Sequence, residues 1–145
     1  MVELSGGKGL EKALVELAKK LTTASEVSIG FLADATYHDG KPVAMVAALN
    51  EFGHEDVPPR PFFRGMIQDK SPEWPEAVGD LLIANGYDGQ RTLEQTGAAI
   101  KGQLQEAITV YVGPGLAEST IERKGHDKEL IDTGTLLRSV DYAVR

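Results

Sequence analysis

A cluster of potential metal ligands lies near the middle of the chain. Glu51 is followed three residues later by the run His54-Glu55-Asp56, and imidazole and carboxylate groups are common metal ligands. However, this spacing matches no metal motif such as two histidines one helical turn apart, and every histidine of the chain lies close to glycine in a polar loop. Solvated loop residues therefore explain the cluster better than a metal site. A small metal-dependent hydrolase using Glu51, His54 and Glu55 is the alternative hypothesis.

Residues for nucleophilic or nucleotide chemistry form no recognised motif. The chain has no cysteine and no Gly-x-Ser-x-Gly turn. The run Gly6-Gly7-Lys8-Gly9 looks like a glycine-rich loop, but no strand precedes it and Lys8 is not followed by Ser or Thr. We therefore expect no catalytic residue and no cofactor, and predict a protein that is not an enzyme.

The second candidate site is Pro58-Pro59-Arg60-Pro61-Phe62-Phe63-Arg64, called here the Pro-Arg-Phe arm. Each proline fixes its own φ and favours extended geometry in the residue before it, so the arm should be stiff and non-helical at its start. Its two rings should divide, one packing inward and one facing a partner. Arg60 and Arg64 either bond a carboxylate such as Glu51 within the chain or contact another subunit, where arginine and aromatic residues are enriched.

Helices that could position these residues follow from the apolar spacing. Apolar residues from Leu10 to Leu21 repeat on one helical face, which predicts an amphipathic helix over about residues 8–22. Val43 to Phe52 reads as an apolar helix that Gly53 ends. Further helices are predicted over about Phe63–Gln68, over about Glu76–Asn85 after a break at Pro72 and Pro75, and over Thr92–Tyr111.

Two segments far apart in the chain have the alternation of half-buried strands, Val27 to Ala33 and Val140 to Val144. A short helix from Gly134 to Arg138 precedes the second strand, and Asp132 or Thr133 can cap it. We expect an α+β fold in which a small, mostly antiparallel sheet is packed by the N-terminal amphipathic helix and the long central helix. Residues 1–145 should form one domain, with a mobile polar loop at about 113–129 that could order on assembly.

The charge and the apolar content of the chain indicate which classes of partner it can bind. The chain has 145 residues and a formal net charge of −7, and an acidic surface does not grip phosphates. No run of about 18 apolar residues and no signal-peptide pattern occurs. We therefore expect no membrane association, and no specific binding of nucleic acid.

Two blocks together resemble a protein family. One is Asn50-Glu51-Phe52-Gly53 followed by the Pro-Arg-Phe arm, and the other is Leu130 to Val140, with the sequence LIDTGTLLRSV. The pair resembles the tailed-bacteriophage neck, tail-completion and virion-morphogenesis proteins related to the minor tail protein Z of lambda-like phages. The insertion from Ser71 to Gly89 departs from that pattern and leaves the neck layer open.

The resemblance implies a virion subunit, assembled in the host cytoplasm, that forms a ring at the head-tail junction. A hexamer is favoured and a dodecamer is possible, with head-closure or adaptor proteins and tail terminator or tail-tube proteins as neighbours, and DNA passing through the lumen. The residues expected at a subunit or partner interface are Arg60, Phe62, Phe63, Arg64 and Trp74. The residues expected to maintain the structural motif are Glu51, Phe52, Gly53, Pro59, Pro61, Asp132, Thr133, Gly134 and Leu137.

Overall fold

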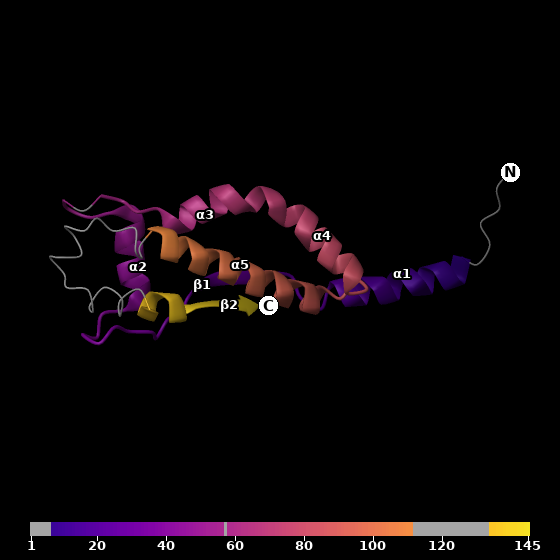
Figure 1. The fold of residues 1–145 in the computed structure, drawn as a ribbon. Coiled ribbons are helices and arrows are strands. Elements are labelled where there is room, and N and C mark those ends of the chain that lie inside the picture. Colours follow the sequence, from indigo (N-terminus) through magenta and orange to yellow (C-terminus); the bar gives the residue numbers. More distant parts are fainter. Residues whose placement is uncertain (1–6, 57, 112–133) are drawn as a thin grey trace.

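The structure, a computed structural model, describes residues 7–56, 58–111 and 134–145 (Figure 1). The predicted mobile loop at 113–129 and the capping residues Asp132 and Thr133 lie outside the described residues. The elements in chain order are α1 (Gly7–Leu21), β1 (Val27–Phe31), α2 (Val43–Phe52), α3 (Phe62–Lys70), the 3-10 helix η1 (Ser71–Glu73), α4 (Trp74–Ala84), α5 (Gly89–Tyr111) and β2 (Val140–Val144).

The sheet joins the two predicted strands. Strand β1 pairs antiparallel with β2, in a register that sets Val27 opposite Val144, Ile29 opposite Tyr142 and Phe31 opposite Val140. These apolar positions alternate with small or polar residues, of which Ser28 and Ala143 are exposed, so the two faces of the sheet differ in burial. The α+β class predicted from the sequence is confirmed.

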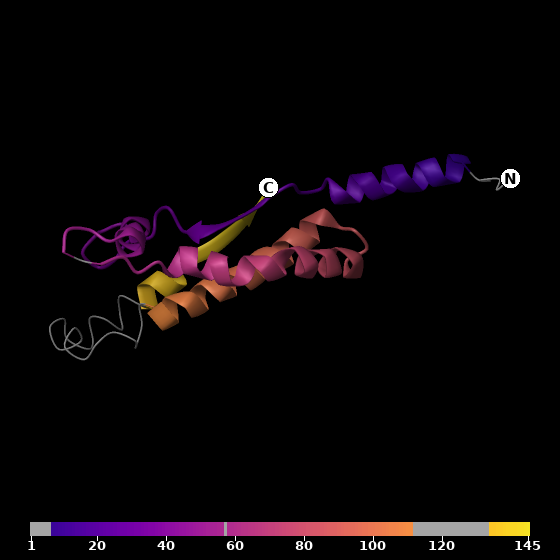
Figure 2. The same cartoon turned by 90° about the horizontal axis from the view of Figure 1, so that it is seen from above.

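The long helix α5 covers the packed face of the sheet. The helices α3, η1 and α4 form an arc along the side of α5 that faces away from the sheet (Figures 1 and 2). Glycine allows the close approach of α5 to β2, because a Cβ atom at Gly97 would collide with the ring of Tyr142 and lie 2.9 Å from Val27 Cγ2. A central cluster of buried residues joins α2, α3, α5, the helical turn at 134–138 and β2: Val43, Ala47, Phe62, Met66, Ile100, Leu104, Ile108, Leu136 and Val140.

Helix α1 is the main departure from the predicted arrangement. Its bounds match the amphipathic pattern, but none of its residues is buried, and it projects from the body beyond the turn between α4 and α5 (Figure 2). The sheet is therefore packed by α5 and not by α1. In the described parts of the chain, no helix combines the length and apolar character required to cross a bilayer.

Candidate functional site

Glu51 is the central residue of the first sequence block. Helix α2 ends immediately after it, because Gly53 adopts a φ of 74° and its N–H donates to the carbonyl of Leu49. The Glu51 residue is only 5% exposed. A buried carboxylate requires hydrogen-bond donors, and α3 supplies them.

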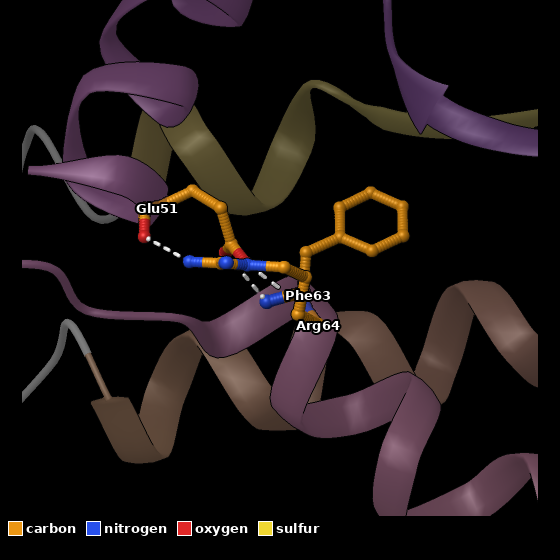
Figure 3. A network of polar contacts seen from close by, with 3 residues as sticks. All are labelled: Glu51, Phe63 and Arg64. Atoms are coloured by element: carbon orange, nitrogen blue, oxygen red, sulfur yellow. Dashed lines mark hydrogen bonds and ion pairs between the residues drawn. The ribbon is translucent and has the colours of Figure 1, made fainter.

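The carboxylate of Glu51 caps the N-terminus of α3 (Figure 3). The preceding residue, Pro61, provides no side-chain cap for this helix. Instead, the backbone N–H of Phe63 donates to Glu51 Oε2 at 2.9 Å, and the N–H of Arg64 donates to Glu51 Oε1 at 3.0 Å. The negative charge also lies at the positive end of the helix dipole, so the contact fixes α2 against α3.

Arg64 completes this network from the other side. Its Nε donates to Glu51 Oε1 at 2.8 Å, and its Nη2 donates to the backbone carbonyl of Glu51 at 3.0 Å (Figure 3). The guanidinium also lies 4.7 Å from the centre of the Phe52 ring, a cation–π geometry. We call Glu51, Phe52, Phe63 and Arg64 the Glu-Arg clamp. It joins the two halves of the first sequence block.

The two arginines of the arm therefore differ. Arg64 makes the internal contact with Glu51 that the sequence leaves open for either residue. Arg60 contributes its backbone N–H to the carbonyl of Asn50 at 2.7 Å. Its half-buried side chain makes no hydrogen bond or ion pair with the residues that the structure describes. Pro59 next to it is exposed.

The two phenylalanines also take different positions. Phe62 is 0% exposed and belongs to the central core. It offers no surface to a partner, so its prediction as an interface residue is wrong. Phe63 is half-buried, and its ring packs edge-on against Phe31 at 6.5 Å between centroids. Of the two rings, Phe63 is therefore the one that reaches the surface.

A pocket of about 260 Å³ opens next to the clamp. Its walls are largely apolar and come from β1, α2 and α3, with Phe31, Ala44, Ala48, Phe52 and Phe63 among the lining residues. The alanines on α2 leave room that larger side chains would fill. The sequence analysis missed Phe31 and these alanines as site residues, because only the packing of β1 beside α2 brings them together.

Helix α2 extends this apolar surface. Its exposed residues include Met45, Leu49 and Phe52, which are 47%, 38% and 64% exposed. Their spacing places them along one side of the helix. A helix as apolar as α2 is usually buried all round. We call the pocket together with this side of α2 the α2 surface.

Three further predicted site residues, Trp74, Leu137 and Gly134, are half-buried within the subunit. Trp74 is half-buried beside the core, and its Nε1 donates to Gln103 Oε1 at 2.9 Å, so it links α4 to α5. Leu137 packs against the core, and its carbonyl accepts a hydrogen bond from Gln105. Gly134 is half-buried in the helical turn at 134–138. A Cβ atom added to it would lie 3.2 Å from Nη1 of Arg138.

The candidate metal ligands are not brought together. His54 and Glu55 are exposed in the loop after α2, whereas Glu51 is turned into the clamp, where its carboxylate is occupied by three donors. Within the described ranges there is no group of three or more His, Asp or Glu side chains placed to hold a metal ion.

The pKa values of two surface carboxyl groups are lowered. The backbone N–H of Lys41 lowers the pKa of Asp39, aided by the charge of the same lysine. The backbone N–H of Tyr142 lowers the pKa of Asp141, and Lys101, whose Nζ lies 3.4 Å from Oδ1, adds to the effect. The second contact ties β2 to α5.

Comparisons of this chain with protein families, with curated proteins and with solved structures found no match.

Proposed function

We propose that this chain is a structural subunit of a tailed-phage virion, which forms a homo-oligomeric ring at the head-tail junction through which DNA passes. A hexamer is the favoured ring and a dodecamer the alternative. Its neighbours would be head-closure or adaptor proteins on one side and tail terminator or tail-tube proteins on the other.

The observation that carries the proposal is the apolar surface left uncovered at two ends of the subunit. Helix α1 exposes Leu10, Leu14, Val15 and Leu21, and α2 exposes a second group beside the pocket. Monomeric soluble proteins rarely expose contiguous apolar patches of this kind, which mark interaction sites. Assembly with other subunits would remove both surfaces from water.

The internal packing of the two sequence blocks supports the same proposal. The first block contributes the Glu-Arg clamp and Phe62, and the second contributes Leu136 and Val140 to the core that contains Phe62. Both blocks therefore stabilise the fold of the subunit itself. This is expected if the two blocks maintain, in this chain and in the family it resembles, a fold that is used for assembly.

The charge of the chain suits a DNA passage. A net charge of −7 repels the phosphate backbone, so DNA could move through a lumen of such subunits without being held.

Electron microscopy of the purified protein tests the proposal. We expect closed rings, six-fold in the favoured case, that join purified heads or tails of the encoding phage. A protein that stays monomeric at high concentration and also fails to join heads or tails would contradict the proposal.

Metal analysis separates this function from the hydrolase hypothesis. We expect no stoichiometric tightly bound metal, and we expect His54→Ala to leave ring formation unchanged because His54 lies exposed outside the clamp. Stoichiometric metal that is lost in His54→Ala would instead favour the hydrolase.

A further inference from the structure

Among the residues that the structure describes, no element covers the apolar face of α1. Leu10, Leu14 and Leu21 are 57%, 55% and 37% exposed. With Leu17 they follow the spacing of one helical face, and the charged residues of α1 lie opposite. An amphipathic helix gains most of its stability from burying such a face, so the missing partner must come from elsewhere.

Contacts directly after α1 hold the segment from which the helix leaves the body. The N–H groups of Ser25 and Glu26 donate to the carbonyl of Arg145 at 2.7 and 3.1 Å, and the N–H of Arg145 donates back to the carbonyl of Glu26 at 3.0 Å. The hydroxyl of Thr23 accepts the N–H of Gln90 at 2.9 Å. Both ends of the connecting segment are therefore held, and α1 is directed outward (Figure 1).

A matching apolar acceptor lies at the opposite end of the molecule. The α2 surface combines a pocket of about 260 Å³ with the exposed side chains of Met45, Leu49 and Phe52. Ala44 and Ala48 line the pocket and leave a shallow site that leucine side chains can enter. Figure 1 shows α1 and α2 at the two far ends of the body.

Charge favours a second copy of the same chain as the occupant. Helix α1 carries four lysines and two glutamates, so its formal charge is +2, and the remainder of the chain therefore carries −9. The helix of one copy is consequently attracted to the body of another, while the two bodies repel each other.

We propose that α1 of one copy docks its leucine face against the α2 surface of the next copy. This inference deepens the ring proposed above by naming its contact, and it rests on that ring consisting of copies of this chain. Donor and acceptor surfaces differ, so the contact is head-to-tail, and its repetition closes a ring when the rotation between successive copies divides a full turn.

Cysteine cross-linking tests the pairing directly, because the chain contains no cysteine of its own. Leu14→Cys is made in one copy and Ala48→Cys in a second copy that carries a tag of different mass. After mild oxidation of the mixture, we expect a disulfide between the two kinds of chain. Neither variant alone should cross-link to itself. Self-cross-linking of Leu14→Cys would show that α1 pairs with α1 and would overturn the proposal.

Sedimentation of substituted proteins provides the second test. Leu14→Gln and Ala48→Gln should each raise the dissociation constant of self-association about tenfold or more, since the first removes an apolar side chain and the second puts a longer polar one into the pocket. Because both residues belong to one contact, their effects should not add in the double variant. Lys12→Arg, on the charged face of α1, keeps the charge of the helix, so it is the control and should leave association within about twofold. Circular dichroism should show the same helix content throughout, because neither Leu14 nor Ala48 is buried.

The outcomes separate this inference from the proposed function. Rings that form without the Leu14–Ala48 cross-link, and that tolerate Leu14→Gln, would overturn the docking and leave the ring intact. A chain that cross-links as expected but joins neither heads nor tails would overturn the neck role and leave the docking. A chain that stays monomeric at every concentration would overturn the docking.

Discussion

The carboxylate of Glu51 performs three tasks with two oxygen atoms. It accepts the first free N–H groups of α3, it pairs with Arg64, and it thereby holds the end of α2 against the start of α3. Arg64 in turn donates to the carbonyl of Glu51 near the C-terminal end of α2, where a cation is favoured. These contacts give a physical reason for the spacing between glutamate and arginine in the first sequence block.

Glu51→Gln should lower the free energy of unfolding by about 1–3 kcal/mol. The new amide nitrogen would face the N–H donors of α3, and the ion pair between buried Glu51 and exposed Arg64 would be lost. Urea denaturation followed by circular dichroism measures the change. Glu106→Gln is the control, because Glu106 is exposed on α5, and it should change stability by less than about 0.5 kcal/mol. Equal effects of the two substitutions would contradict the role of the clamp.

Asp141 should contribute to the acid side of the stability profile. Its pKa is lowered in the folded chain, chiefly by the N–H of Tyr142 and then by Lys101. A carboxyl group with a lowered folded pKa stabilises the protein above its unfolded pKa, about 4, and this contribution is lost as pH falls through the folded value. Asp141→Asn should therefore reduce the loss of stability between pH 4 and lower pH.

Denaturation across that acidic range, with pH varied in small steps, measures the effect. Lys101→Gln should change the profile less than Asp141→Asn does, because the backbone N–H of Tyr142 remains. A wild-type profile that is unchanged in Asp141→Asn would contradict this assignment.

At the scale of elements, α5 organises the body because it packs against the sheet and against α3 and α4. Glycines interrupt its sequence at two described interior positions with different surroundings. Gly97 faces the ring of Tyr142 across a gap too small for a Cβ atom, whereas a Cβ atom at Gly102 would meet nothing within 4 Å. The same residue type therefore serves close packing at one site and has no such role at the other.

Alanine at these two glycines should have opposite effects. Gly97→Ala should destabilise the protein by about 1–3 kcal/mol, because the added methyl group forces Tyr142 or Val27 to move. Gly102→Ala should stabilise it by about 0.5–1 kcal/mol through higher helix propensity. Thermal denaturation of both variants compares them, and stabilisation by both would show that the sheet moves freely away from α5.

At the scale of the whole molecule, the subunit is elongated, with α1 at one end and α2 at the other (Figure 1). Both helices leave apolar side chains exposed. A chain of this shape buries less apolar surface alone than in an assembly. Its stability should therefore depend on the concentration of its partner.

The thermal midpoint should rise as the protein concentration increases, since self-association binds only folded chains. Calorimetry over a wide concentration range measures the effect. A midpoint independent of concentration would contradict self-association.

Local patterns in the sequence determined most of the elements. The bounds of α2 and β2 follow their predicted ranges, since Gly53 ends the helix and strict alternation marks the strand. The sequence also determined that Arg60 or Arg64 could bond Glu51, and that the two phenylalanines would divide. It could not choose between the phenylalanines, because one residue of difference in helix position decides which ring faces inward. It could not choose between the arginines, because only the start of α3 at Phe62 places Arg64 in the helix and leaves Arg60 before it.

Only the tertiary structure decided which surfaces remain uncovered. The leucine face of α1 predicts burial, but the contacts of Ser25 and Glu26 with Arg145 direct the helix away from the sheet. The sheet is packed by α5, the other helix expected there. The pocket of the α2 surface likewise forms only because the fold brings Phe31 of β1 together with residues of α2 and α3. Periodicity records that a face is apolar, whereas the path of the chain determines what covers that face.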